Sequence, residues 1–260
     1  MIALVTGASS GIGEAAARRI AREPGWELVL VARREERLRA LADELGGSTV
    51  VVTDLTDEGA PDAVREAVER EHGGRLHLLV NNAGGAWRGR FGETGWENVQ
   101  RHMELNFDAV LRLTEALLPA LRASAPSSIV NVSSTAGRVS RGNSGAYSAS
   151  KFALAGWSDA LHLEEARHGV HVGLVLPGFV ATEGFPQREL VDRRATRWLV
   201  SKPERVAEAI WQTGPGGKAE RYVPRPYWLA AAARALAPAL VRRATGGGAA
   251  MTPSTRGDAE

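Results

Sequence analysis

The chain has 260 residues, of which 44% are hydrophobic, and its formal net charge is +2. This length and hydrophobic content suit one α/β domain with a single sizeable core. The sequence contains no cysteine, which excludes disulfides and thiolate metal sites. The histidines lack metal-ligand spacing and the arginines are interleaved with Glu and Asp, so we predict neither a metal nor a nucleic-acid partner.

Apolar runs of strand length alternate with helical patterns along the chain. The strands are expected at 2–7, 27–32, 48–54, 76–82, 127–134, 170–178 and 220–224, and the helices at 12–22, 35–45, 60–71, 96–123, 147–167 and 203–212. This alternation predicts a Rossmann-type, doubly wound α/β fold with a seven-stranded, mostly parallel sheet and helices on both faces. Since the first strand begins at position 2, a secretory signal has no room, and we expect a cytoplasmic protein.

The stretch "TGASSGIG" at residues 6–13 joins the first predicted strand to the first helix. Gly7 permits a sharp turn, Gly11 lets the backbone approach a pyrophosphate, and Gly13 lets the helix pack closely on the sheet. A glycine-rich turn without a ligand is the alternative, but the strand before it and the helix after it favour dinucleotide binding. Ser9, Ser10 and Ile12 of the same turn are included in the predicted cofactor site.

The end of the second predicted strand indicates which nicotinamide cofactor is bound. An NAD site expects a carboxylate there for the ribose hydroxyls, but the chain reads Ala32, Arg33, Arg34. Two guanidiniums suit a 2′-phosphate, so NADP(H) is favoured and NAD(H) is the less favoured alternative. The arginines could instead solvate the start of the following helix.

Tyr147 and Lys151 stand at i and i+4, which puts both on one face of a predicted helix. A nearby cation can lower the pKa of a tyrosine, which makes the phenol a better acid or base at neutral pH. Ser133 and Ser134 follow the fifth predicted strand, where a hydroxyl could donate to a substrate carbonyl. The alternatives are an incidental helical pair and a serine-capped turn.

These motifs together, TGxxxGxG, NNAG, Ser, YxxxK and PG in this order, resemble the short-chain dehydrogenase/reductase family in its single-domain, NADP-using branch, over residues 2–225. The resemblance implies hydride transfer between the nicotinamide and a carbonyl or secondary alcohol. It implies that Tyr147 is the acid/base and that Lys151 lowers its pKa and holds the nicotinamide ribose. It further implies that Ser134 polarises the carbonyl and that Asn106 anchors a water in a proton relay.

The same resemblance implies further cofactor contacts. These lie after the third, fourth and sixth predicted strands: Asp54 with Leu55, then Asn82, Ala83 and Gly84 of NNAG, and Pro177, Gly178, Val180 and Thr182 of "PGFVAT". Much of the role of NNAG is structural in this family, and Asp54 could serve as a plain loop cap.

Residues 182–202 form an insertion whose composition is typical of a substrate lid. Trp87, together with Phe185 and Trp198 of this lid, could line an apolar pocket or serve only in packing. The chain ending differs from that of ketoacyl-carrier-protein reductases and resembles relatives that handle hydrophobic ketones. We therefore expect a small-molecule, hydrophobic carbonyl or alcohol substrate.

Residues 1–225 are expected to form the single catalytic domain, residues 226–244 an apolar helix, and residues 245–260 a disordered tail. The apolar helix could lie on a membrane surface, but a position over the pocket mouth or against a second subunit is favoured. A homodimer or homotetramer is expected, since the family pairs its subunits through helices. The supporting face is Phe152, Leu154, Trp157 and Leu161.

The sequence thus predicts an NADP(H)-dependent oxidoreductase that acts on a carbonyl or alcohol. The alternative is a protein that senses or scaffolds with NADP without turnover. The intact set of Asn106, Ser134, Tyr147 and Lys151 favours the enzyme.

Overall fold

The computed structural model describes residues 1–183 and 199–246. Seven strands form one sheet in the order β3-β2-β1-β4-β5-β6-β9, and every pairing in it is parallel. Their bounds are β1 (Ile2–Thr6), β2 (Glu27–Ala32), β3 (Thr49–Val52), β4 (Leu78–Asn81), β5 (Ser127–Val132), β6 (Val170–Pro177) and β9 (Glu220–Val223). The predicted doubly wound sheet is confirmed. Its strand order reverses between β1 and β4, which is where such folds bind ligands.

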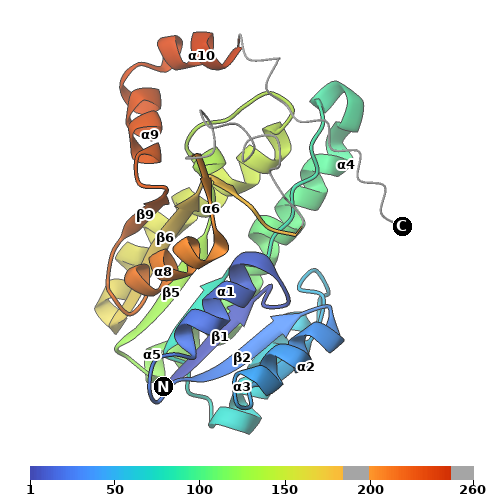
Figure 1. Cartoon of the computed structure of the whole chain (residues 1–260), viewed down its shortest axis with the longest axis vertical. Helices are drawn as coiled ribbons and strands as arrows, with labels where there is room; N and C mark the ends of the chain where they lie inside the picture. The colour runs from blue at the N-terminus through green and yellow to red at the C-terminus, as the bar shows by residue number, and fades with distance from the viewer. Residues whose placement is uncertain (184–198, 247–260) are drawn as a thin grey trace.

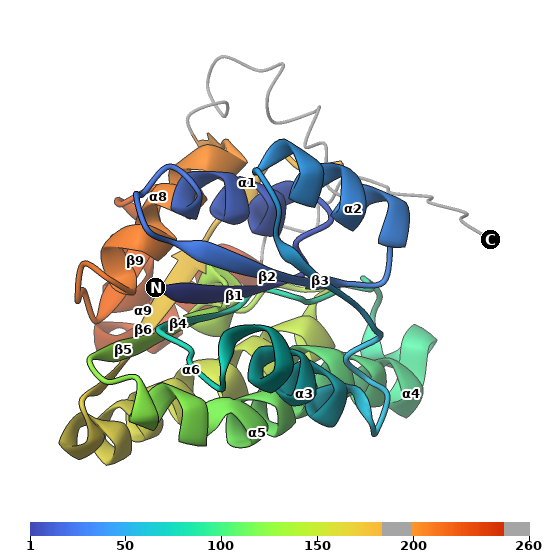
Figure 2. The same cartoon turned by 90° about the horizontal axis from the view of Figure 1, so that it is seen from below.

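Helices cover both faces of the sheet (Figures 1 and 2). One face carries α1 (Gly11–Ile20), α2 (Glu35–Glu44) and α8 (Pro203–Thr213). The other face carries α3 (Ala60–His72), α5 (Ala109–Ala123) and α6 (Gly145–Glu165). A short parallel pair of β7 (Phe179–Val180) and β8 (Val200–Ser201) follows β6.

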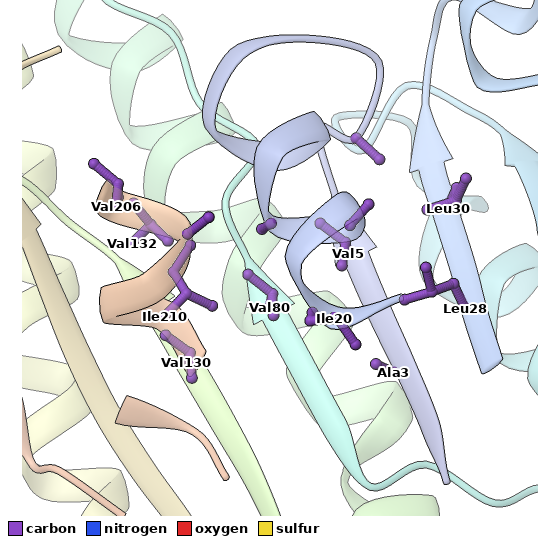
Figure 3. Packing of buried hydrophobic residues seen from close by; sticks show 14 of the residues in the cluster. Ala3, Val5, Ile20, Leu28, Leu30, Val80, Val130, Val132, Val206 and Ile210 are labelled. Carbon is purple, nitrogen blue, oxygen red and sulfur yellow. The ribbon is translucent and has the colours of Figure 1, made fainter. Parts of the chain in front are cut away.

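The core consists of two apolar layers, one on each face of the sheet. In the first, Ile20 of α1 and Ile210 of α8 pack on Val5, Val80 and strand neighbours of theirs (Figure 3). The second layer joins the opposite side chains of the same strands to α3, α5 and α6. Since the strands are buried on both faces, their sequences read as continuous Val, Ile and Leu runs.

The prediction of one continuous helix over 96–123 was wrong. Helix α4 (Phe91–Met103) begins earlier, and Gly95 interrupts it with φ 62°. A π-helical turn, η1 (Glu104–Asp108), separates α4 from α5. A π turn inserts a residue into the helical spacing and re-aims the side chains beside it, which often happens at functional sites.

The prediction of one apolar helix over 226–244 was also wrong. Two helices follow β9, α9 (Tyr227–Leu236) and α10 (Pro238–Gly246), and the break falls at Pro238, whose ring cannot continue a helix interior (Figure 1). Within the described residues, no helix is long and apolar enough to cross a bilayer. Most of the predicted tail over 245–260, and residues 184–198 of the predicted lid, lie outside the described residues.

The face proposed for subunit pairing is mostly internal. Leu154 is 0% exposed and Leu161 is 6% exposed, and both belong to the core of this chain, with Trp157 packed against it. Of the predicted face only Phe152 is exposed, and Leu163 of α6, which was not predicted, is exposed as well. Helical spacing alone did not distinguish the face of α6 that meets the sheet from the face that meets solvent.

Candidate active site

The glycine-rich turn between β1 and α1 depends on its three glycines. Gly7 and Gly11 have φ of 65° and 58°, in the region that favours glycine. A Cβ on Gly13 would lie 2.2 Å from the carbonyl oxygen of Gly7, so only glycine lets α1 approach the turn this closely. Ser10 precedes the helix in extended conformation and its side chain does not cap it. The first N–H groups of α1 are therefore directed at the carboxyl edge of the sheet, where they can bind an anion.

The NNAG stretch ties β4 to this turn. The Asn82 amide donates to the Thr6 carbonyl oxygen over 2.9 Å, and the N–H groups of Asn82 and Ala83 donate to Thr6 Oγ1 over 2.9 and 3.0 Å. A Cβ on Gly84 would lie 2.8 Å from Asn106 Oδ1 and 3.4 Å from Lys151 Nζ. The stretch therefore holds β1, β4 and the predicted catalytic side chains together.

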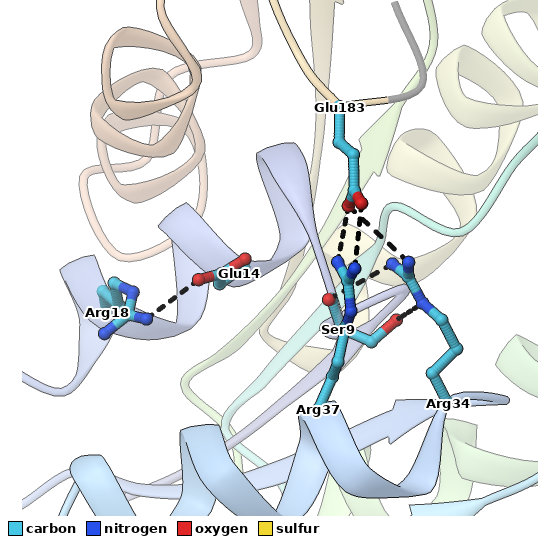
Figure 4. Close-up of polar contacts among 6 residues, drawn as sticks. All are labelled: Ser9, Glu14, Arg18, Arg34, Arg37 and Glu183. Atoms are coloured by element: carbon cyan, nitrogen blue, oxygen red, sulfur yellow. Dashed lines mark hydrogen bonds and ion pairs between the residues drawn. The ribbon is translucent and has the colours of Figure 1, made fainter.

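Two arginines, Arg34 and Arg37, lie close together beside the glycine turn (Figure 4). Arg34 donates to the hydroxyl and the carbonyl oxygen of Ser9, each over 3.2 Å. Arg37, one turn into α2, pairs with the Glu183 carboxylate, with 2.8 Å between Nη2 and Oε1, and Arg34 lies 3.6 Å from the same carboxylate. Arg37 holds the pKa of Glu183 below its usual range, which keeps the carboxylate charged. The Arg34 and Arg37 pair can therefore hold an oxyanion.

Arg33 and the residues after β3 do not belong to the Arg34 and Arg37 pair. Arg33 pairs with Asp54 over 3.2 Å, and Asp54 Oδ1 accepts from the N–H and hydroxyl of Thr56. Asp54 thus caps its own loop, as the structural alternative expected. The Leu55 side chain packs in the core rather than toward the cleft.

Ser134, Tyr147 and Lys151 converge at the carboxyl ends of β5 and β6. Ser134 starts a 3-10 turn, η2 (Thr135–Gly137), where its Oγ accepts from the Ala136 N–H and donates to the Pro177 carbonyl oxygen. Tyr147 lies in the first turn of α6, and Lys151 Nζ, one turn later, donates to the Val132 carbonyl oxygen over 3.0 Å. All three side chains line one cavity.

The pKa values of this pair follow from burial. Burial raises the pKa of Tyr147, while the Ser134 hydroxyl acts in the opposite direction. This net direction is opposite to the one predicted from the sequence, and it keeps the phenol protonated at neutral pH. Burial also lowers the pKa of Lys151 to about 8. Both shifts have the ordinary cause that a group removed from water disfavours its charged form.

Asn106 lies in the π turn and braces the site. Its amide donates to the Gly85 carbonyl oxygen over 2.9 Å and accepts from the Gly85 N–H over 2.9 Å, and it also donates to Ser150 Oγ over 3.1 Å. Ser150 in turn donates to the carbonyl oxygen of Tyr147. Asn106 therefore couples the loop after β4 to the helix that carries Tyr147.

Trp87 is not among the residues that line the cavity. The ring that packs beside Tyr147 is that of His102, which the sequence did not predict. His102 is fully buried, its Nε2 accepts from the Trp87 N–H over 3.0 Å, and its Nδ1 donates to the Asn98 carbonyl oxygen. The rings of His102 and Tyr147 meet edge to face at 6.1 Å, and Arg101 stacks on Trp87. Burial lowers the pKa of His102, so it packs as a neutral ring.

A cavity of about 950 Å³ opens at this edge of the sheet. Many of the predicted site residues line it: Ile12, Asn82, Gly84, Ser134, Tyr147, Lys151, Pro177, Gly178, Val180 and Thr182. Thr182 also reaches the glycine turn, since its Cγ2 lies 3.2 Å from where a Gly11 Cβ would be. Phe185 and Trp198 lie outside the described residues. Among the described residues, no three His, Cys, Asp or Glu side chains gather as metal ligands.

Lys151 gives a pH-dependent stability that can be measured. Its pKa is about 8 in the folded protein and about 10.4 in an unfolded chain. Between these values the unfolded state binds more protons, so this group makes the free energy of unfolding rise as pH rises. We expect wild type to gain stability relative to Lys151→Met from pH about 8 to about 10. Urea unfolding across this range tests the expectation, and parallel curves for the two proteins would contradict it.

The family model described as short chain dehydrogenase matches residues 1–190. The chain therefore belongs to the short-chain dehydrogenase family. It is 38% identical to oxidoreductase UcpA of Salmonella typhimurium, over 74% of this chain and 73% of that protein. It is 34% identical to an uncharacterized oxidoreductase of Staphylococcus epidermidis, over 80% of this chain and 88% of that protein.

Two solved structures share the architecture. L-sorbose reductase from Gluconobacter frateurii, complexed with NADPH and L-sorbose, superposes with a TM-score of 0.76 at 28% identity, covering 85% of this chain and 93% of its own. A variant of actinorhodin polyketide ketoreductase with NADPH superposes with a TM-score of 0.75 at 32% identity, covering 85% of this chain and 94% of its own. The chain is thus an oxidoreductase of this family by fold, sequence and site composition.

Proposed function

We propose that the protein is an NADPH-dependent reductase that converts a carbonyl group to an alcohol. The observation that carries the proposal is the convergence of Ser134, Tyr147 and Lys151 on one cavity, next to a glycine turn built for a dinucleotide. A protein that only sensed the cofactor would not need a protonated phenol and a serine hydroxyl at that cavity. Solved relatives that contain NADPH support the same assignment.

The residues present fit NADPH. The turn at Gly7 and Gly11 and the first N–H groups of α1 would hold the pyrophosphate, and Arg34 and Arg37 would hold the 2′-phosphate. The Glu183 carboxylate on these two arginines supports this assignment, because a phosphate would use the same donors. Lys151 and Val180 would contact the nicotinamide end, since both line the cavity.

Cofactor preference gives the first test of this assignment. We expect Arg34→Gln or Arg37→Gln to weaken NADPH binding about 10- to 100-fold, because a charge-assisted hydrogen bond contributes about 1.5 to 3 kcal/mol. NADH binding should change much less. Arg39→Gln is the matched control, since Arg39 lies on the same helix and pairs with Glu35 at the surface. Fluorescence titration with both cofactors measures the effect, and an equal loss for NADPH and NADH would show that the arginines are only structural.

NADPH, when bound, supplies the hydride that reduces the carbonyl carbon. Tyr147 donates the proton to the carbonyl oxygen, a role that its raised pKa and protonated hydroxyl suit. The Ser134 hydroxyl donates to the same oxygen as negative charge develops there. Lys151 lies one helical turn from Tyr147 with a pKa of about 8, so it can return a proton toward the phenol near neutral pH. Asn106 keeps α6 and the loop after β4 in place around these groups.

The cavity also indicates the kind of substrate. Val139, Phe179, Leu199 and Val241 line it together with the catalytic residues, so an apolar body is accommodated. A panel of ketones and aldehydes, assayed for NADPH consumption with NADH in parallel, tests the proposed function. Turnover that prefers NADPH supports it. Tight NADPH binding without turnover of any carbonyl in the panel would favour the sensing alternative.

A further inference from the structure

Arginines from four segments line the outer part of the cavity. They are Arg88 and Arg90 after β4, Arg141 after β5, Arg234 of α9 and Arg242 of α10. None of the described residues that line this cavity is Asp or Glu, although those two types make up 30 of the 260 residues of the chain. Such a concave surface with charge of one sign concentrates ions of the opposite sign.

Several arginines outside the cavity are paired with carboxylates. Arg19 pairs with Glu23 and Glu208, and Arg65 pairs with Asp62 and Glu69. In contrast, no carboxylate of the described residues lies within 4 Å of Arg141, Arg234 or Arg242.

Arg90, which also lines the cavity, has two polar neighbours among the described residues. Arg90 donates to the Asn143 side chain and lies 4.0 Å from Glu93, which is outside the cavity lining. Arg141, Arg234 and Arg242, which we call the arginine wall, therefore line the cavity without a carboxylate partner among the described residues.

Arg141 is the most informative member of this wall. Its guanidinium stacks on the Phe179 ring, with its central carbon 4.5 Å from the ring centroid. Burial lowers the pKa of Arg141; Tyr227 acts in the opposite direction, and the charge of Arg88 adds a smaller lowering effect. An anion placed here would offset the cost of removing this guanidinium from water.

The phosphates of the cofactor do not account for this wall. The pyrophosphate has the glycine turn and α1, and the 2′-phosphate has Arg34 and Arg37, neither of which lines the cavity. The wall lines the same cavity as Tyr147 and the apolar residues Val139 and Leu199.

We propose that the substrate is a carbonyl compound with an apolar body and an anionic group, a carboxylate or a phosphate ester, which the wall of Arg141, Arg234 and Arg242 binds while the carbonyl lies at Tyr147. This inference rests on the proposed reductase function and names its substrate class. A neutral ketone would leave these guanidiniums facing an apolar ligand, which costs affinity.

The test compares methyl ketones that differ only in their far end. A homologous series from 6-oxoheptanoate to 10-oxoundecanoate is assayed beside the methyl esters of the same acids and beside (ω−1)-oxoalkyl phosphates of equal length. We expect kcat/KM for the best anionic ketone to exceed that of its ester by about 10- to 100-fold. The preference should fall as ionic strength rises. A higher kcat/KM for the carboxylates identifies the anionic group of the substrate as a carboxylate, and a higher kcat/KM for the phosphates identifies it as a phosphate ester.

Variants locate the preference on the wall. Arg141→Gln and Arg234→Gln should each reduce the ratio of anionic to neutral kcat/KM about 10-fold or more. Arg243→Gln is the matched control. It removes the same charge from α10 at the position next to Arg242, but Arg243 does not line the cavity. Thermal unfolding of each variant shows whether it is folded.

The outcomes separate this inference from the proposed function. If ketones are reduced but esters and acids are used equally well, or if the variants leave the ratio unchanged, the arginine wall does not bind substrate and the inference is wrong. Binding of heptanoate against heptanamide to the complex with NADP⁺ is measured by calorimetry and needs no turnover. Equal binding of both overturns the inference, whereas preferred heptanoate binding without reduction of any ketone sustains the anion site and overturns the reductase assignment.

Discussion

Replacing Tyr147 by Phe is expected to lower kcat about 10²- to 10⁴-fold, which is the usual contribution of a positioned general acid. The variant keeps the ring that contacts His102 at 6.1 Å and loses only the hydroxyl. Since burial holds that hydroxyl protonated, its loss removes the proton that the carbonyl oxygen would receive. NADPH affinity should change little, because the phosphates are bound elsewhere. Steady-state reduction of the best ketone, with a parallel NADPH titration, measures both quantities.

Tyr222→Phe is the matched control for this variant. Tyr222 lies in β9 outside the cavity lining, where its hydroxyl interacts with Glu220 and Arg138. Its loss should leave kcat within about twofold, as for a surface change away from the site. If Tyr147→Phe reduced the ketone as fast as the control while binding NADPH normally, Tyr147 would not be the proton donor.

Gly13→Ala is expected to destabilise the protein by about 1 to 3 kcal/mol or more and to abolish tight NADPH binding. The new methyl group would lie 2.2 Å from the carbonyl oxygen of Gly7 and 2.6 Å from the Asn82 amide nitrogen. Neither neighbour can move freely, because the Asn82 amide donates to the Thr6 carbonyl oxygen between β1 and β4. Helix α1 would have to withdraw from the turn, which displaces the N–H groups that would bind the pyrophosphate. Urea unfolding and NADPH titration measure the two effects.

Gly156→Ala makes the same chemical change but is expected to stabilise the protein. Gly156 is exposed within α6, and no atom lies within 4 Å of where its Cβ would be. Alanine should therefore stabilise the protein by about 0.5 to 1 kcal/mol through helix propensity. The account of the turn would be wrong if Gly13→Ala unfolded at the same urea concentration as Gly156→Ala and retained NADPH binding.

The sheet and the central catalytic set could be predicted from the sequence for physical reasons. Parallel strands buried on both faces read as Val, Ile and Leu runs, and the ends of such strands share one edge of the sheet. The strand end indicated Ser133 and Ser134, of which the family resemblance selected Ser134, and Tyr147 with Lys151 were found because i and i+4 share a helix face. Each of these rules uses only residues that are close together in the sequence.

Features that depend on distant neighbours were missed or misread. The π turn places Asn106 against Gly85, which is distant in the sequence, and hydrophobic periodicity does not reveal it. Arg37 was overlooked although it stands four residues after Arg33, a helical spacing that could have indicated it.

Burial and long-range placement were equally hidden from the sequence. Leu154 and Leu161 have the spacing of an apolar face, but periodicity does not say whether that face meets the sheet or a second subunit. The pKa direction of Tyr147 depends on burial, which the spacing to Lys151 does not give. Likewise, Arg141 and Arg234 are far apart in the chain and line the same cavity only because of the fold.

Isotope transfer tests the central claim most directly. The protein is incubated with NADPH that carries deuterium at both C4 positions and with the best ketone of the panel, and the alcohol is analysed by mass spectrometry. We predict one deuterium at the carbinol carbon of the alcohol, and the small amount of alcohol that Tyr147→Phe still makes should carry the same label. An alcohol without deuterium, or no alcohol from any carbonyl while NADPH is bound tightly, would contradict the assignment of this protein as an NADPH-dependent carbonyl reductase.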